Sequence, residues 1–174
     1  MSKSKAEALI QCAIAAHLGE KNIMIPNVSF ARTSCRVPGY GNNGQLIGHE
    51  YPFKGVRHEA DLIWINDNDY LTEVEIKTSY SDFLADFKKK EKHLTKYTRA
   101  VYYAFPWDMY KENEEKIKKV LVEKFPKAGV IIIGMGGLAV SVIKNVEYFN
   151  AEKIPIEVKI GLMRIGCQKW WRRK

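Results

Sequence analysis

The most restrictive feature of the sequence is the stretch 61–77, in which two short apolar segments flank a polar run of Asn and Asp residues. This pattern predicts two strands joined by a turn. Side chains alternate along a strand, so Glu73, Glu75 and Lys77 are expected on one face and the intervening Val and Ile on the other. Four successive apolar residues follow Asp61, which is typical of a strand covered on both faces. Two carboxylates and an ammonium should therefore share a face.

Such a cluster suits metal-assisted hydrolysis of a phosphodiester. Carboxylates from neighbouring strands can hold Mg²⁺ (or Mn²⁺), which prefers oxygen ligands and keeps several waters. The metal lowers the pKa of a bound water, while a nearby Lys orients that water or stabilises developing charge. Asp61, Glu75 and Lys77 supply these parts, with Glu73 as an auxiliary. The alternative is a half-exposed strand whose polar face meets solvent.

Strand parity makes the proposed cluster testable. If the two strands form an antiparallel hairpin, Asp61 lies opposite Glu75 only when the loop has an odd number of residues, such as 67–69. A two-residue turn would send Glu75 to the other face unless a bulge restored the parity. We therefore predict an odd loop, with the carboxylates close enough to share one cation and the Lys77 ammonium on the same side.

The order Asp61, then Glu75 and Lys77, resembles the PD-(D/E)XK nuclease superfamily. The run 73–88 and the residues that follow it are similar to a bacterial and phage branch associated with DNA repair, akin to Holliday-junction resolvases. The resemblance covers roughly residues 59–135. Ala60 stands where the family has Pro; that Pro shapes the backbone and ligates nothing.

The resemblance implies an α/β, restriction-endonuclease-like fold with a mixed central sheet flanked by helices. It also implies a Mg²⁺-dependent deoxyribonuclease, most simply an endonuclease in DNA repair, recombination or phage DNA processing. Asp61 and Glu75 would be metal ligands. An acidic residue on the first helix can assist in the family, which makes Glu7 a further candidate ligand, although Glu7 also has the spacing to cap its own helix.

Composition is consistent with one globular domain spanning residues 1–174 and an anionic partner. The net charge is +8 and the isoelectric point about 9.3, which favours nucleic acid. DNA is the expected partner and RNA is not excluded. No apolar run approaches the ~18 residues of a membrane span, and no signal-peptide pattern opens the chain, so a cytoplasmic protein is expected. Three widely spaced Cys suggest neither disulfides nor a zinc site. A homodimer is left open.

Two internal segments carry cations that could meet DNA. Residues 31–57 are rich in Gly and contain Arg32, Arg36 and Arg57, which predicts a basic loop or hairpin that closes over DNA. The alternative is a loop that orders only with substrate.

The second segment is a helix expected from about residue 79, directly after the acidic strand. Lys88, Lys92 and Lys96 recur on it at four-residue spacing, with His93 on an adjacent track, and this row could follow a phosphate backbone. A solvated helix face is the alternative.

The remaining pattern alternates strands and helices, which predicts a mixed α/β sheet. A helix is expected over 4–18, a strand over 22–30 that bends or ends at Pro26, strands over 99–105, 128–133 and 138–143, and a helix over 111–125. A last helix should begin near residue 156. Its basic aromatic end, within 156–174, could stack on bases or anchor the helix to the core.

Two other functions are compatible with these residues. One is a non-catalytic DNA- or RNA-binding protein that retains the nuclease fold. The other is an RNA-directed or ribonucleoprotein module, which the positive charge does not exclude.

Overall fold

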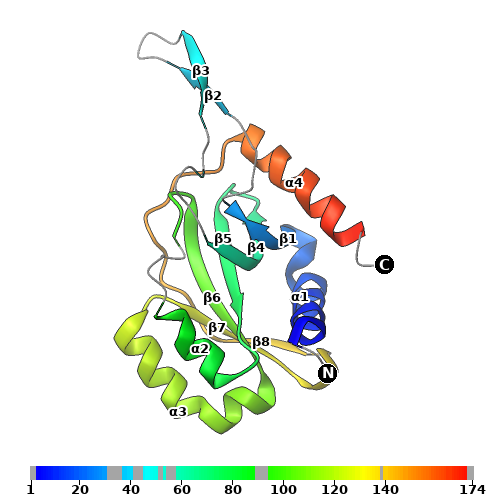
Figure 1. Cartoon of the computed structure of the whole chain (residues 1–174), viewed down its shortest axis with the longest axis vertical. Coiled ribbons are helices and arrows are strands. Elements are labelled where there is room, and N and C mark those ends of the chain that lie inside the picture. Colours follow the sequence, from blue (N-terminus) through cyan, green and yellow to red (C-terminus); the bar gives the residue numbers. More distant parts are fainter. Residues whose placement is uncertain are drawn as a thin grey trace.

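The computed structural model describes residues 3–30, 37–40, 45–50, 53, 58–88, 94–137 and 139–171, with the backbone alone for 3–4, 37–40, 46–50 and 135. Its centre is a six-stranded mixed sheet flanked by four helices (Figure 1). The predicted mixed α/β sheet with flanking helices is therefore confirmed.

The strands across the sheet are, in order, β1 (Asn22–Ser29), β4 (Glu59–Asn66), β5 (Leu71–Ile76), β6 (Thr98–Pro106), β7 (Gly129–Ile133) and β8 (Val140–Lys144). The pairs β1–β4 and β4–β5 are antiparallel, β5, β6 and β7 run parallel, and β8 returns antiparallel to β7. Because β5, β6 and β7 are parallel, their carboxyl ends lie at one end of the sheet.

A separate antiparallel hairpin forms within the Gly-rich segment. It consists of β2 (Val37–Tyr40) and β3 (Leu46–Glu50). Figure 1 shows this hairpin projecting from one end of the molecule, near the start of the last helix. A hairpin was one of the two structures predicted here; its contact with DNA stays a prediction.

The four helices are α1 (Lys3–Leu18), α2 (Tyr80–Asp86), α3 (Trp107–Lys124) and α4 (Ile156–Trp171). Leu62 of β4 packs with α1 residues such as Ile14, whereas the next residue, Ile63, packs with α4 residues such as Leu162. Helices α2 and α3 cover the strands β6 and β7, where Phe83 and Leu121 join one cluster. Strand β4 is thus covered on both faces, as its apolar run predicted, whereas β8 at the edge of the sheet has exposed residues. None of the helices in the described part of the chain is long and apolar enough to cross a bilayer.

The turn between β4 and β5 contains three residues, 67–69. The Asn66 N–H donates to the Tyr70 carbonyl at 3.1 Å, and the Asp69 N–H donates to the Asn66 carbonyl at 3.0 Å. Asp69 has φ = 63°, a left-handed conformation that Asp adopts more readily than most residues. This is a common three-residue hairpin loop. The predicted odd loop length is confirmed.

Strand β1 does not end at Pro26. It pairs with β4 on both sides of this residue, and Pro26 itself lies opposite Leu62. Because β1 is at the edge of the sheet, the missing Pro N–H leaves no neighbouring strand without a donor. The distortion comes one residue later, at Asn27, whose φ is 52°.

The helix predicted from residue 79 is much shorter than expected. Ser79 caps α2 by accepting the Asp82 N–H at 3.2 Å, but the helix ends at Asp86. Lys96 lies in a turn where the Thr95 and Thr98 hydroxyls are 2.9 Å apart. Threonine hydroxyls that bind nearby backbone groups compete with helix formation. The prediction that Lys96 lies in a row of lysines along this helix is therefore wrong.

Helix α3 begins earlier than the predicted residue 111. It starts at Trp107, directly after Pro106 at the end of β6. The other predicted strands and the last helix occur within two residues of the expected bounds.

Candidate active site

The polar face of β5 is buried. Glu73, Glu75 and Lys77 are only 0%, 2% and 4% exposed, while Val74 and Ile76 pack in the α1 cluster on the other face. The alternation was predicted correctly, and the alternative of a solvated polar face is wrong. Burying charged groups is costly unless each is paired or hydrogen-bonded. The partners of these side chains therefore decide what the cluster does.

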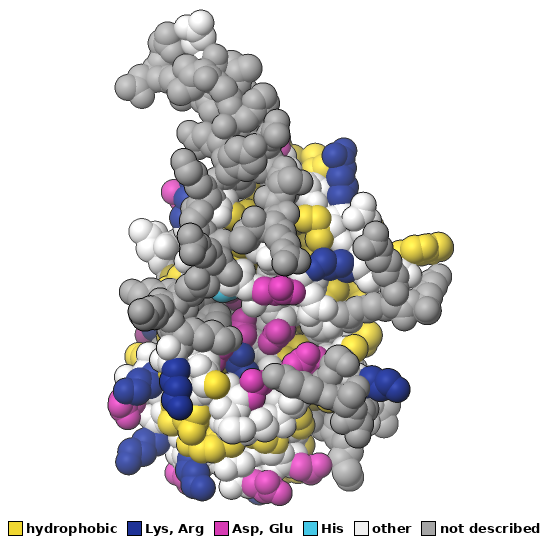
Figure 2. All heavy atoms as spheres, in the orientation of Figure 1, with side chains coloured by type: hydrophobic (Ala, Val, Ile, Leu, Met, Phe, Trp, Pro, Cys, Tyr) yellow, Lys and Arg dark blue, Asp and Glu magenta, His cyan; other side chains and the backbone are white. Residues whose placement is uncertain are grey.

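Asp61 joins this face through the register of the β4–β5 hairpin. Leu62 pairs with Val74 and Ile63 with Glu73, so Asp61 falls in line with Glu75 and on the same side of the sheet. The Ile76 N–H donates to Asp61 Oδ2 at 2.7 Å, which fastens the carboxylate across the end of β5. The predicted common face of Asp61, Glu75 and Lys77 is confirmed. Figure 2 shows acidic side chains gathered near the middle of one face of the molecule.

The Asp61 carboxyl has an unusually high pKa. Burial is the main cause and the neighbouring Glu75 charge the second, and together they raise the pKa of Asp61 from 3.8 to about 7. The Ile76 N–H and the Lys77 ammonium act in the opposite direction, and the charge of Glu7 adds to the rise. The half-buried Asp61 and the buried Glu75 thus repel each other at the end of β5. A cation placed between them would relieve this repulsion.

The chemistry of these donors fits a hard divalent cation. Asp61 and Glu75 offer carboxylate oxygens, the ligands that Mg²⁺ prefers, and Mg²⁺ is often bound by only one or two carboxylates plus water. Within the described residues, no group of three or more Asp, Glu, His or Cys side chains is arranged to hold a metal ion.

Lys77 is clamped between two acids. Its Nζ donates to Glu75 Oε2 at 2.8 Å and to Asp86 Oδ1 at 3.1 Å. Burial lowers the pKa of Lys77, but the charges of Glu75 and Asp86 outweigh burial and leave the pKa above its ordinary value. The ammonium therefore stays charged at neutral pH. It is suited to donate hydrogen bonds and stabilise negative charge, and unsuited to act as a base.

Asp86 and Tyr103 belong to this cluster and were not predicted. The Tyr103 hydroxyl donates to Asp86 Oδ2 at 3.0 Å, so Asp86 links Lys77 to β6. Burial, and then the Asp86 charge, raise the pKa of Tyr103 and keep its hydroxyl protonated. One signal was present in the sequence. Asp86 lies three residues after Phe83, on the apolar side of α2. An acidic residue in that position indicates that its carboxylate has a buried polar partner.

Glu73 belongs to a different network. Its Oε1 accepts from the Thr98 hydroxyl at 2.5 Å, and its Oε2 is hydrogen-bonded to His58 Nε2 at 2.9 Å. Burial is the main reason that the pKa of Glu73 is raised. The Phe30 ring lies 5.0 Å from the His58 ring and helps to enclose the pair. Both carboxylate oxygens are engaged here, which favours a structural role for Glu73 over metal ligation.

Helix α1 supports Asp61 from the opposite side. Gln11 Nε2 donates to the Asp61 carbonyl oxygen at 2.5 Å and to Asn27 Oδ1 at 2.8 Å. Glu7 lies one turn before Gln11, and its charge acts on Asp61. Glu7 is therefore near the cluster, and its role as a ligand stays a prediction.

The cations expected to meet DNA are only partly described. Lys88 is exposed just beyond α2, and Lys96 forms an exposed ion pair with Glu152 at 3.0 Å. The remaining five residues predicted to bind nucleic acid lie outside the described residues: Arg32, Arg36, Arg57, Lys92 and His93. At the C-terminal end of α4, Trp170 Nε1 donates to the Met24 carbonyl at 2.8 Å, which supports the predicted anchoring role for one of the paired indoles.

Comparison with known proteins identifies a fold and no family. No family model matches the chain, and no curated protein matches it. Among solved structures, the chain is similar to a protein of unknown function from Silicibacter pomeroyi, with 16% sequence identity and a TM-score of 0.55. The match covers 95% of this chain and 85% of that one. At this identity, the likeness shows that the two chains share a fold.

Proposed function

We propose that this chain is a Mg²⁺-dependent nuclease that hydrolyses phosphodiester bonds in DNA. The observation that carries the proposal is the convergence of Asp61, Glu75 and a doubly paired Lys77 at the buried end of β5. A PD-(D/E)XK nuclease requires the same residue types in this order, which is the resemblance that the sequence presents. The net charge of +8 suits a polyanionic substrate.

Each residue then has a defined part. Asp61 and Glu75 would hold the metal, whose contribution is to lower the pKa of a bound water and to neutralise charge on the phosphate. Lys77, kept charged by its two acidic partners, orients the attacking water or stabilises the charge that develops on the phosphate. Asp86 fixes the direction of the Lys77 ammonium and is itself held by the Tyr103 hydroxyl.

A cleavage assay on linear, flapped and four-way DNA, with Mg²⁺ and with a chelator, tests the proposal. We expect cleavage in Mg²⁺ alone, and a fall of at least about 100-fold for Asp61→Asn and for Glu75→Gln. Asp67→Asn is the matched control, because Asp67 is exposed in the turn between the same two strands. Thermal melts should show that the three variants fold.

Two results would contradict the proposal. Cleavage that persists in chelator would exclude the metal, and full activity in both site variants would exclude the site. Binding of DNA by the native protein without any cleavage would instead support the non-catalytic DNA-binding function that the sequence also allows.

A further inference from the structure

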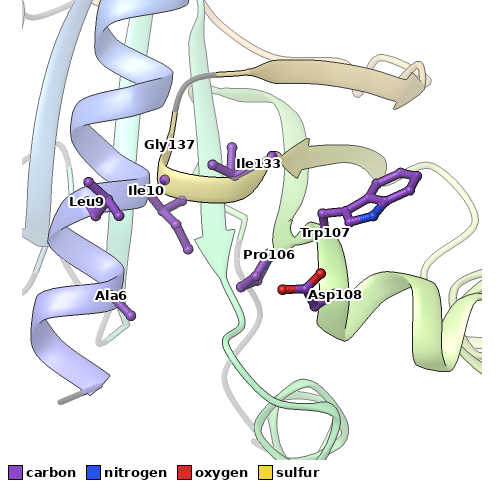
Figure 3. Close-up of a pocket in the computed structure, with 10 residues that line it drawn as sticks. Ala6, Leu9, Ile10, Pro106, Trp107, Asp108, Ile133 and Gly137 are labelled. Atoms are coloured by element: carbon purple, nitrogen blue, oxygen red, sulfur yellow. The ribbon is translucent and has the colours of Figure 1, made fainter. Parts of the chain in front are cut away.

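A pocket of about 340 Å³ lies between α1, the start of α3 and the turn η3 (Met135–Gly137), beyond the end of β7 (Figure 3). Leu9 and Ile10 line it from α1, and Pro106, Trp107 and Asp108 line it from the other side. Its volume falls in the range of sites that take small ligands. Gly137 has φ = 75°, and a Cβ there would stand 3.4 Å from Leu9, so glycine lets this turn approach α1 closely.

The walls of this pocket keep large apolar side chains in contact with solvent. Trp107 is 45% exposed and Leu9 is 42% exposed. The Lys111 ammonium lies over the Trp107 ring, 5.6 Å from its centre, and 3.9 Å from Glu114 Oε2. The Asp108 carboxylate is at the rim on the same side (Figure 3). An exposed indole, a cation over its ring and a carboxylate acceptor match three parts of a nucleotide: the base plane, the phosphate and an amino group of the base.

The pocket also lies at the same end of the sheet as the acidic cluster. Its residues Pro106 and Ile133 pair with each other at the carboxyl ends of β6 and β7, which run parallel to β5 and its terminal acids. On α1, the lining residue Ala6 precedes Glu7, whose charge acts on Asp61. The pocket's lining residues Ile10 and Ile133 belong to the α1 cluster, so the pocket is on the face of the sheet opposite to the acids. A strand bound at the acidic cluster would pass around this end of the sheet to place a neighbouring nucleotide in the pocket.

We infer that this pocket binds one unpaired nucleobase of the substrate by stacking it on Trp107. The inference rests on the proposed nuclease function and narrows its substrate class to DNA with unpaired nucleotides, such as single strands, flaps or junction arms that have opened. The base stacks on the indole, Lys111 moves from its place over the ring to face the phosphate, and Asp108 accepts from an amino group of the base.

Binding of a single-stranded oligonucleotide and of the same sequence as a duplex, measured by fluorescence anisotropy in the Asp61→Asn background, tests this site. Trp107→Ala should weaken single-strand binding by about 5- to 100-fold, the usual effect of losing one stacked base, and leave duplex binding within about twofold. Ala6→Phe should have the same effect, because it fills the pocket and keeps the indole. Tyr148→Ala is the matched control, since Tyr148 is an exposed aromatic residue outside the pocket.

Conservative variants separate a base from an aliphatic ligand. Trp107→Phe should retain single-strand binding within about threefold, whereas Trp107→Leu should behave like Trp107→Ala. Equal binding of the oligonucleotide by the Phe and Leu variants would show an apolar contact without stacking, and would overturn the inference. Unchanged single-strand affinity in Trp107→Ala and Ala6→Phe, in a protein that still cleaves DNA, would overturn this site and leave the nuclease proposal standing. A native protein that neither binds nor cleaves any DNA would overturn both.

Discussion

Asp61 is the residue at which folding and the proposed chemistry oppose each other. Its half-buried carboxyl is partly desolvated and lies near the charge of Glu75, so its pKa is raised to about 7, and the backbone N–H of Ile76 only partly compensates. The folded chain therefore holds the Asp61 proton to a higher pH than the unfolded chain does. Between pH 4 and pH 7 the folded state binds more protons, so stability falls as the pH rises. The contribution of Asp61 to the free energy of unfolding is fully present below about pH 4 and is lost as the pH rises to about 7.

This linkage predicts a specific effect of Asp61→Asn on the free energy of unfolding in metal-free buffer. From pH 5 to pH 8, the native protein should lose about 2–3 kcal/mol relative to the variant, because only the native protein must ionise this buried carboxyl. Urea titrations at both pH values measure the difference, and the contribution of Glu73 cancels in the comparison. Adding Mg²⁺ at pH 8 should restore stability to the native protein and not to the variant. Parallel pH dependences for the two proteins would contradict the raised pKa.

At the same scale, the sequence predicted the residues of one strand and missed their partners. Glu73, Glu75 and Lys77 follow from alternation, which is a local property of the chain. Asp86 and His58 reach the same face from outside that strand, and no local spacing ties them to it. Glu73 was accordingly given a metal-binding role, although its oxygens are engaged by His58 and Thr98.

At the scale of elements, predictions succeeded where the pattern was strong and local. The strands and the last helix were found because their apolar runs and breaks are clear. The helix after Lys77 was extended too far because Lys and Leu residues favour a helix, whereas the hydroxyls of Thr95 and Thr98 form a turn instead. An end of the strand at Pro26 is wrong because an edge position, which the sequence cannot show, tolerates Pro, and the distortion of the strand lies one residue later, at Asn27.

The three-residue loop between β4 and β5 fixes the register on which the site depends, and its length can be varied. Deleting Asn68 would leave two residues, shift the pairing by one, and set the acids of β5 on the α1 face. We expect this variant to unfold or to lose all cleavage activity. Inserting Gly-Asn after Asn68 keeps the parity and lengthens the loop at a cost of about 1 kcal/mol or less.

Circular dichroism melts and the cleavage assay measure both loop variants. The insertion is the control, because it changes the length of the same loop by more residues than the deletion does. It nevertheless leaves every strand residue on its own face. An active deletion variant with native-like melting would show that the register is not what unites Asp61 with Glu75.

Across the whole molecule, the excess of positive charge is not spread evenly, because part of it is neutralised locally. On α3, Lys118 lies 3.0 Å from Glu114 and 3.1 Å from Glu115, and Lys96 is paired with Glu152. Such exposed pairs add little stability, but they leave less net charge for a polyanion. Lys88 instead is exposed and follows Asp86, the partner of Lys77, by two residues in the chain.

The dependence of DNA affinity on salt should report this arrangement. Each phosphate contact adds about 0.7 to 0.9 to the slope of log affinity against log salt concentration. We therefore expect Lys88→Gln to lower the slope by roughly that amount, and to do so equally for all DNA sequences, since a phosphate contact reads no base. Lys118→Gln and Lys96→Gln are matched controls with acidic neighbours, and should leave the slope unchanged. A slope that falls equally in all three variants would mean that DNA affinity depends on the net charge of the protein. It would contradict binding of DNA at the face that carries Asp61 and Glu75.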